Sequence, residues 1–401
     1  MKILLLNLYY PPDTSATAKM AHTAVDEMSV HHQVTVICGR PSYDPSEQRT
    51  WRLFQMELVG RTRIIRAGST AFPRYEMKKR MMNYLSYVAL AVPRALLARC
   101  DVVLAMTDPP FQGIVGAIVA WLKRKPYVYN IRDLYPDMAV GGAIVEPGEF
   151  ARLWEKLHRW ALRRAQRVIV LGEDMRARII AKGVEASRMV VVRDGAEVLP
   201  PHVPVPSPDP DVVRTIRGSF SFVLVHAGNL GFYGAWNTLV VAGRRLASEG
   251  VTLVFIGSGA QRGQIEAAAS GARNIRFLDF FPSSKIPSVL AAADAHIITV
   301  KRGLEGVVVP SKLYGILAAG KPVVAVAPKE TDVVSLGLQR GFAVAADPDK
   351  PEEVVAAIRE LLFDPNKLKS LGEAARAAAP DYDRVKELRK FVQTIEEAGQ
   401  T

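Results

Sequence analysis

The segment VVPSKLYGILAAGKPVVAV, residues 308–326, indicates the fold of this chain more clearly than any other stretch. A loop ending in Ser311 and Lys312 opens a short apolar helix, a glycine ends that helix, and Pro322 begins a buried strand. A lysine in the first helical turn is unfavourable without an anion, because the free N–H groups there carry partial positive charge. The segment therefore predicts a phosphate or diphosphate site at Pro310, Ser311 and Lys312.

Short apolar runs alternate with helical stretches along the whole chain, which argues for parallel sheets covered by helices. The first series of expected strands covers residues 2–8, 33–38, 62–67, 101–106, 126–131, 167–171 and 189–193. The second series covers residues 220–226, 251–256, 274–278, 295–300 and 322–326. We therefore expect an α/β protein with two Rossmann-like, doubly wound domains that face each other across a ligand cleft.

A proline-rich stretch separates the two series. Six prolines between residues 199 and 210 favour an extended connector over a helix. The sequence thus predicts an N-terminal domain over residues 1–198, a linker over 199–218, a C-terminal domain over 219–380 and a terminal helix over 381–401.

Composition places the chain among ordinary globular proteins. Of its 401 residues, 49% are hydrophobic and 23% are charged. The two cysteines, Cys38 and Cys100, are too few for a metal site and favour a reduced compartment. The N-terminus is expected to form a strand, and no apolar run is long enough for a membrane-spanning helix. We therefore expect a cytoplasmic protein.

The positive charge lies mainly in the first half. Residues 1–200 carry 29 Lys and Arg against 19 Asp and Glu, within a formal charge of +12 for the chain. Residues 74–85 combine cations, methionines and tyrosines at helical spacing. A second basic stripe is formed by Arg159, Arg163, Arg164 and Arg167. This favours contact between the N-terminal domain and an anionic membrane surface, since no nucleic-acid reader motif is found.

Two glycine loops follow expected strands in the second half. Gly228 and Asn229 end the first strand of that series, and Gly257 and Ser258 end the second. Glycine lets the backbone approach a ligand and point N–H groups at phosphate oxygens. A plain tight turn explains the first loop equally well and the second loop better, so both interpretations stay open.

In the first half, the sequence YNIRDLYPD over residues 129–137 places charged residues where a strand ends. Charged residues are poor core material, so a ligand role is favoured for Asn130, Arg132, Asp133 and Asp137. Asp133 can orient or deprotonate an acceptor hydroxyl, and Arg132 can hold an acceptor phosphate. The structural alternative is an ion pair of Arg132 with either aspartate that stiffens the loop.

The loop after the first strand contains Asp13, Thr14 and Ser15. It lies at the carboxyl end of a strand, where such folds bind ligands, and its hydroxyl groups can hold an acceptor or a phosphate. A helix cap is an equally good explanation.

Residues 126–138 and 303–326 strongly resemble the retaining glycosyltransferases of family 4, and residues 222–234 and 274–300 do so moderately. The closest pattern is a bacterial subgroup that builds O-antigen, capsule and exopolysaccharide. The resemblance implies a GT-B fold whose C-terminal helix crosses back to the N-terminal domain. It also implies a metal-independent, retaining, hexosyltransferase-type enzyme without a cofactor. Its donor would be a nucleoside-diphosphate sugar, foremost a UDP-sugar, and its acceptor a lipid-linked saccharide at the inner membrane face.

The resemblance also assigns roles. The loops at Gly228 and Gly257 would cover the donor diphosphate and nucleotide, and Lys312 would stabilise the departing diphosphate. Phe281 and Pro282 would lie near the nucleobase, whereas Phe280 is expected to pack in the core.

Some family positions are vacant in this chain. Two glutamates are common in the family at positions occupied here by Val307 and Gly315. Glu305 is a candidate replacement for the first glutamate. Glu330 is a candidate for binding the ribose hydroxyls, although a carboxylate in the first helical turn explains it slightly better. Asn229 stands where an arginine is common.

Two other functions stay open. A nucleotide-sugar epimerase of the same architecture would need a carboxylate pair around a UDP-sugar, and none is identified. A membrane-bound partner subunit that has lost transfer activity would be consistent with the vacant positions.

Overall fold

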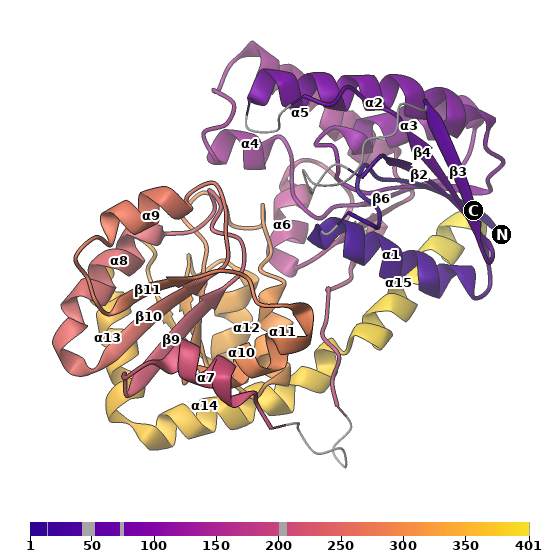
Figure 1. Cartoon of the computed structure of the whole chain (residues 1–401). Helices are drawn as coiled ribbons and strands as arrows, with labels where there is room; N and C mark the ends of the chain where they lie inside the picture. Colours follow the sequence, from indigo (N-terminus) through magenta and orange to yellow (C-terminus); the bar gives the residue numbers. More distant parts are fainter. Residues whose placement is uncertain (14, 42–52, 73–75, 200–206, 401) are drawn as a thin grey trace. The chain divides into compact units, whose positions relative to one another are not determined.

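The protein is represented by a computed structural model, which describes residues 1–13, 15–41, 53–72, 76–199 and 207–400 (Figure 1). The chain forms two compact units. Unit 1 comprises Met1–Val192 and Lys386–Thr401, and unit 2 comprises Arg193–Val385. Each unit is built on one sheet, which confirms the predicted α/β class with two doubly wound domains.

Unit 1 contains an eight-stranded sheet in the order β3-β4-β2-β1-β5-β6-β7-β8, in which only β3 runs antiparallel to its neighbour. Its strands are β1 (Lys2–Leu6), β2 (Gln33–Gly39), β3 (Phe54–Val59), β4 (Thr62–Ala67), β5 (Val102–Ala105), β6 (Tyr127–Asn130), β7 (Arg167–Val170) and β8 (Met189–Val191). Its helices are α1 (Ala16–Ser29), α2 (Met77–Leu97), α3 (Gln112–Lys123), α4 (Asp137–Gly141), α5 (Glu149–Arg164), α6 (Glu173–Ala181) and α15 (Arg384–Gln400).

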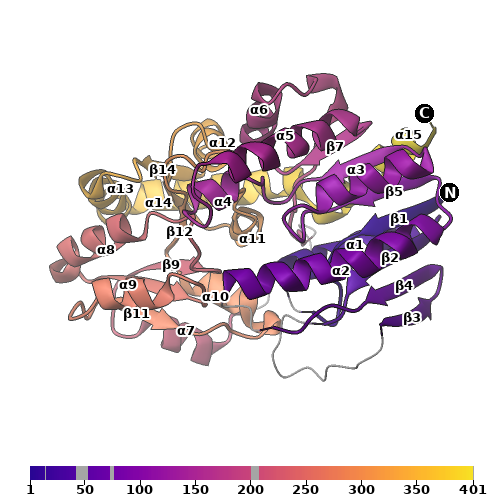
Figure 2. The same ribbon diagram turned by 90° about the horizontal axis from the view of Figure 1, so that it is seen from above.

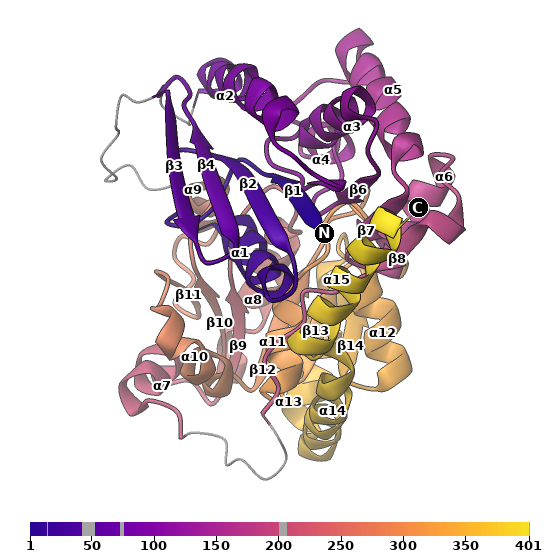
Figure 3. The same ribbon diagram turned by 90° about the vertical axis from the view of Figure 1, so that its right-hand side faces the viewer.

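Helices cover both faces of this sheet, which is why its central strands are continuous apolar runs. Helices α1 and α15 lie on one face, and α2, α3 and α5 lie on the other (Figures 1 and 3). Phe391 and Ile395 of α15 share a hydrophobic core with Ile3 and Leu5 of β1. The C-terminal helix therefore packs on the N-terminal domain, as predicted.

Unit 2 contains a six-stranded parallel sheet in the order β11-β10-β9-β12-β13-β14. Its strands are β9 (Phe222–Ala227), β10 (Val251–Ile256), β11 (Ile275–Leu278), β12 (Ala295–Thr299), β13 (Val323–Val326) and β14 (Ala343–Ala346). Its helices are α7 (Pro210–Arg217), α8 (Trp236–Arg245), α9 (Arg262–Ala268), α10 (Ile286–Ala292), α11 (Lys312–Ala318), α12 (Asp332–Arg340), α13 (Pro351–Phe363) and α14 (Pro365–Ala378).

The second half of the predicted linker is a helix, which corrects the boundary at residue 218. Asp209 caps α7 by accepting a hydrogen bond from the backbone N–H of Asp211 at 2.9 Å, and Pro210 occupies the first turn, where its missing N–H costs nothing. Val212 and Ile216 are buried in the core of unit 2. Within the predicted linker, residues 200–206 lie outside the described residues.

Candidate functional site

The topological switch point of unit 2 lies between β9 and β12. The strand β9 pairs with β10 on one side and with β12 on the other. Its register with β12 contains only two pairs, Ala295 with Leu224 and His296 with Val225, so the two strands separate towards their carboxyl ends. Ligands of open α/β sheets bind outside the carboxyl ends of the strands at such a point. The residues that surround it form the candidate site.

Lys312 reaches this point from the first turn of α11 and contacts His226 of β9. Lys312 Nζ lies 2.9 Å from His226 Nε2, and His226 Nδ1 lies 3.2 Å from the carbonyl oxygen of Ile297 on β12. A carbonyl oxygen only accepts, so the neutral imidazole carries its proton on Nδ1 and Nε2 accepts from the lysine. His226 is buried, and Lys312 remains partly exposed.

Burial changes the protonation of both side chains. Desolvation lowers the pKa of Lys312 to about 7. Burial, followed by the charge of Lys312, lowers the pKa of His226 well below its ordinary value. Within the described part of the chain no carboxylate forms an ion pair with Lys312. An amine without a counter-charge, held at a ligand-binding edge, is suited to binding an anion.

The two glycine loops lie against each other beside this lysine. Gly228 N–H donates to the carbonyl of Ile256 at 2.8 Å, and Leu230 N–H donates to the carbonyl of Ser258 at 2.8 Å. Gly228 has φ +142°, and a Cβ at this residue would lie 3.2 Å from Lys312 Nζ. Glycine at position 228 therefore leaves open space around the lysine amine. Asn229 and Ser258 are both exposed at this edge.

Phe280 stands beside the glycine loops, and its predicted core position is wrong. Its side chain is 60% exposed, and its Cε1 would lie 3.0 Å from a Cβ built at Gly257. Phe281, predicted to lie near a nucleobase, packs against the hydrophobic cluster of unit 2, and Pro282 is exposed. Only one phenylalanine of the pair therefore faces the core. Nothing in the sequence distinguished the two.

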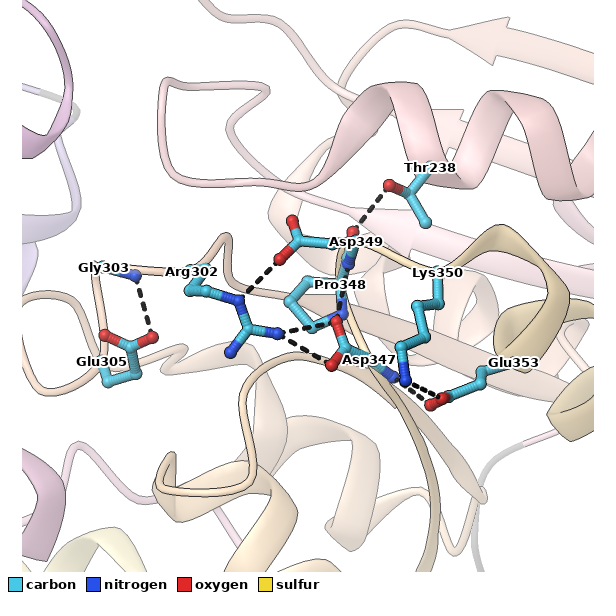
Figure 4. Close-up of polar contacts among 9 residues, drawn as sticks. All are labelled: Thr238, Arg302, Gly303, Glu305, Asp347, Pro348, Asp349, Lys350 and Glu353. Atoms are coloured by element: carbon cyan, nitrogen blue, oxygen red, sulfur yellow. Dashed lines mark hydrogen bonds and ion pairs between the residues drawn. The ribbon is translucent and has the colours of Figure 1, made fainter.

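The loop after β12 is held in place by local polar contacts (Figure 4). Glu305 accepts a hydrogen bond from the backbone N–H of Gly303 at 2.8 Å. Arg302 donates to Asp349 at 2.6 Å and to Asp347 at 2.8 Å, so its charge is balanced within unit 2. No ion pair involves Lys301 among the residues that the structure describes, which makes it a second available cation at this edge.

The vacant family positions differ from each other in their surroundings. Val307 is completely buried. A Cβ at Gly315 would make only an ordinary contact, 3.6 Å from Leu290. Glu330 is exposed after β13, and Thr331 is the N-cap of α12. Glu330 therefore precedes the helix and is not the first-turn carboxylate that the alternative interpretation supposed.

In unit 1 the switch point lies between β1 and β5, and the loops after β1, β5 and β6 are joined there. The backbone N–H of Leu8 donates to the carbonyl of Asp108 at 2.7 Å. The backbone N–H of Arg132 donates to Thr107 Oγ1 at 2.8 Å. The segment that begins with Asn130, predicted to face a ligand, therefore lies at the carboxyl edge of the sheet. Asn130 itself is buried at the end of β6.

Asp133 is partly exposed in a cluster of ionisable side chains. Burial raises the pKa of Tyr135, and the negative charges of Asp133 and Asp108 raise it further. Arg80 donates a hydrogen bond to Tyr84 at 2.5 Å, and both line a small cavity of about 50 Å³. The sequence did not single out Arg80 as a ligand residue, because its place beside this edge depends on the packing of α2.

Other residues predicted on the acceptor side make structural contacts. Asp137 accepts from Arg178 at 3.0 Å and lies 2.7 Å from Lys182 Nζ. Ser15 caps α1 by accepting from the backbone N–H of Ala18 at 3.1 Å. Asp13 is buried in the same loop, and Thr14 lies outside the described residues.

Among the side chains that the structure describes, no group of three or more His, Cys, Asp or Glu residues is placed to hold a metal ion. No helix in the described ranges combines the length and the apolar character needed to cross a bilayer.

Comparison with known proteins gives consistent matches in both halves. A family profile described as "Glycosyl transferase 4-like domain" matches residues 17–195, and one described as "Glycosyl transferases group 1" matches residues 221–364. WcaI of Escherichia coli (strain K12), whose name connects it with glycosyl transfer in colanic acid biosynthesis, is 25% identical over 98% of this chain and 100% of its own length. WbjE of Pseudomonas aeruginosa, named as a glycosyltransferase, is 26% identical over 74% of each chain.

A solved structure shares the fold. The Anabaena protein Alr3699/HepE, crystallised in complex with UDP-glucose, matches with a TM-score of 0.69 and 19% identity, covering 99% of this chain and 100% of its own.

Proposed function

The chain belongs to the family 4 glycosyltransferases of GT-B fold, and from that premise we propose that it moves a hexose from a UDP-sugar to a lipid-linked saccharide with retention of configuration. The product would be a cell-surface polysaccharide precursor. The acceptor would be met at the inner face of the membrane.

The contact between Lys312 and His226 carries the proposal for the donor. An amine whose pKa is about 7 lies at the switch point, next to glycines that leave room for a ligand. A diphosphate placed there would accept hydrogen bonds from Lys312. Its negative charge would raise the pKa of the lysine, so that the amine would be fully protonated. Phe280 would offer its exposed ring to the uracil, and Glu330 would accept from the ribose hydroxyls.

The chemical step follows from the charge that develops on the leaving group. As the bond between the sugar and the diphosphate breaks, negative charge grows on the diphosphate oxygens, and Lys312 stabilises it at a fixed position. In a retaining front-face transfer the departing diphosphate takes the proton of the acceptor hydroxyl. Asp133 would orient that hydroxyl, and Arg132 would hold an acceptor phosphate. This step needs no resident metal ion.

The acceptor proposal draws on two independent supports. Unit 1 contains most of the excess positive charge, which suits an anionic lipid-linked acceptor. The name of WcaI refers to the biosynthesis of colanic acid, and we extend that class of product, a cell-surface polysaccharide, to this chain.

A UDP-release assay with purified protein tests the proposal. We expect release from one UDP-hexose that rises when a lipid extract carrying saccharide acceptors is added, and that persists in EDTA. Proton NMR of the product should show the anomeric configuration of the donor. Conversion of one free UDP-sugar into another would indicate the epimerase instead. UDP binding without release in any lipid extract would indicate the partner subunit.

A further inference from the structure

Helices α3 and α5 of unit 1 expose an unusual number of large apolar side chains. Trp121 is 55% exposed and Phe150 is 60% exposed. The exposed apolar residues are Ile118, Trp121 and Leu122 on α3, and Phe150, Leu153, Leu157 and Trp160 on α5. Such a set on one surface indicates an interaction site.

The apolar residues of α5 form a stripe that is separate from its core stripe. Phe150, Leu153, Leu157 and Trp160 recur at intervals of three and four residues, so they share one side of the helix. The core side is formed by other residues, namely Ala151, Trp154, His158, Ala161 and Leu162, which are buried in unit 1. The exposed stripe is therefore not needed to attach α5 to its own domain.

Cations surround this apolar surface. Where α3 and α5 end, an open depression of about 600 Å³ is lined by Trp121, Leu122, Arg124, Lys125 and Arg164. In the described ranges, no ion pair balances any of these three cations. Two further cations of α5, Lys156 and Arg163, also have no ion-pair partner among the described residues. The surface thus combines indole rings, aliphatic side chains and unbalanced positive charge.

We infer that the outer face of α3 and α5 docks on a bilayer that contains anionic lipids. Aromatic and aliphatic side chains insert at the headgroup level, and the flanking cations contact lipid phosphates. In the depression, the phosphate of one lipid would contact Arg124, Lys125 and Arg164, and its acyl chain would pack on Trp121. A second copy of this chain fits less well, because its own face would bring the same unpaired cations into contact.

This face coincides with only part of the surface that the sequence emphasised, namely the basic stripe of Arg163 and Arg164 on α5. The segment 74–85 contributes exposed Met82 and Leu85 on α2, which lies in the same helical layer as α3 and α5 (Figure 2). Two of its cations are already engaged, because Lys79 pairs with Glu76 and Arg80 donates to Tyr84. The unbalanced charge and the indole rings lie on α3 and α5.

This docking face deepens the proposed function, because it would bring the enzyme to a lipid-linked acceptor. Only that purpose rests on the proposed function. The docking itself is tested without any sugar transfer. The full chain is mixed with sedimenting vesicles of phosphatidylcholine, with or without phosphatidylglycerol. We expect sedimentation only with the anionic vesicles, weakened by added salt, together with a blue shift of tryptophan fluorescence.

Variants locate the contact. Removing Arg124, Lys125 and Arg164 together (R124A, K125A and R164A) should lower partitioning by about two orders of magnitude, because each cation near an anionic surface contributes about fivefold, or roughly 1 kcal/mol. Trp121→Ala combined with Trp160→Ala should remove the fluorescence shift. Phe363→Ala and Lys369→Ala change exposed residues of unit 2 and should leave both readouts unchanged.

Three outcomes would overturn the inference: equal binding to neutral and anionic vesicles, full binding by the triple variant, or a concentration-dependent dimer without lipid that the tryptophan variant abolishes. UDP-dependent thermal stabilisation, measured on the same samples, keeps this result separate from the proposed function. Vesicle binding without UDP binding would leave the docking face intact and count against the donor site. UDP binding without vesicle binding would count against the docking face and leave the donor site intact.

Discussion

The side-chain amine of Lys312 lies 2.9 Å from Nε2 of His226, which itself is tied through Nδ1 to the carbonyl of Ile297. The lysine therefore depends on a neutral imidazole as its acceptor rather than on a carboxylate. Because desolvation brings the pKa of Lys312 to about 7, its charge changes near neutral pH in the free protein. The affinity of the donor site for UDP should therefore depend on pH.

UDP binding should weaken as pH rises above 7. The bound diphosphate needs the charged amine and raises its pKa, so each molecule of UDP that binds brings a proton with it. The dissociation constant should rise towards tenfold per pH unit above about pH 7.5. Calorimetry in two buffers of different ionisation enthalpy would show the proton uptake.

Lys312→Arg serves as the control for this prediction, since arginine stays charged and should give a flat profile. Lys312→Ala should weaken UDP about 10- to 100-fold at pH 7, as expected for a charged hydrogen bond. A pH dependence that survives in either variant would contradict the assignment.

His226→Ala should act through Lys312. Loss of the imidazole leaves the Lys312 amine without the hydrogen bond that orients it, and we expect UDP affinity to fall about three- to tenfold. The pH profile of binding should also change, an effect that a merely structural role would not produce. His226→Gln, whose amide oxygen can accept from the amine, should restore most of the affinity.

Phe280→Ala should weaken UDP and leave inorganic pyrophosphate unaffected. Stacking of a base on an aromatic ring contributes roughly 1–3 kcal/mol, so the dissociation constant for UDP should rise about 5- to 100-fold. The ring is 60% exposed, so stability should change little. Equal losses for UDP and pyrophosphate would show that the ring acts on the loop and not on the base.

Asp133→Asn should slow transfer without changing donor binding. The amide keeps the shape of the side chain but lacks the negative charge that orients the acceptor hydroxyl, and we expect a fall in kcat of about 10²-fold. Unimpaired transfer with an intact UDP-dependent thermal shift would rule out the role proposed for this carboxylate.

Asp137→Asn should destabilise unit 1 and not affect the chemistry directly. Burial alone would raise the pKa of Asp137, but the hydrogen bonds and charges of Lys182 and Arg178 outweigh it and lower the pKa. The ionised carboxylate therefore contributes stability above about pH 4, and this contribution is lost as pH falls through the lowered pKa of the folded state.

At pH 7 the loss should be about 1–3 kcal/mol, visible in urea unfolding, and it should shrink in acid. Asp211→Asn breaks an exposed pair with Arg214 and should change stability by less than about 0.5 kcal/mol at either pH.

Local sequence patterns were sufficient for much of the fold. The apolar runs that became β1, β9 and β13 are buried on both faces, and such runs are readable without knowledge of their partners. Two edge strands, β3 and β14, were not predicted. Their sequences lack a long run of β-branched residues. They form strands through their pairing with β4 and β13, respectively.

Function was predicted least well where it depends on the direction of a side chain. Phe280 and Phe281 are chemically identical, and only the packed structure shows which one leaves the core. Asp137 and Asp133 lie in the same short loop. Asp137 is engaged by Arg178 of α6 and by Lys182, which follows α6. Neither contact can be predicted from the sequence of the loop itself.

The sequence by itself determined that this chain has two doubly wound sheets and a lysine at the start of α11, because strand periodicity and helix starts depend on neighbouring residues. Only the tertiary structure decided what that lysine contacts. His226 lies 86 residues away in sequence and reaches Lys312 because β9 and β12 diverge at the switch point. The apolar part of the face of α3 and α5 was decided in the same way, since packing selects which stripe of each helix is buried and which remains exposed.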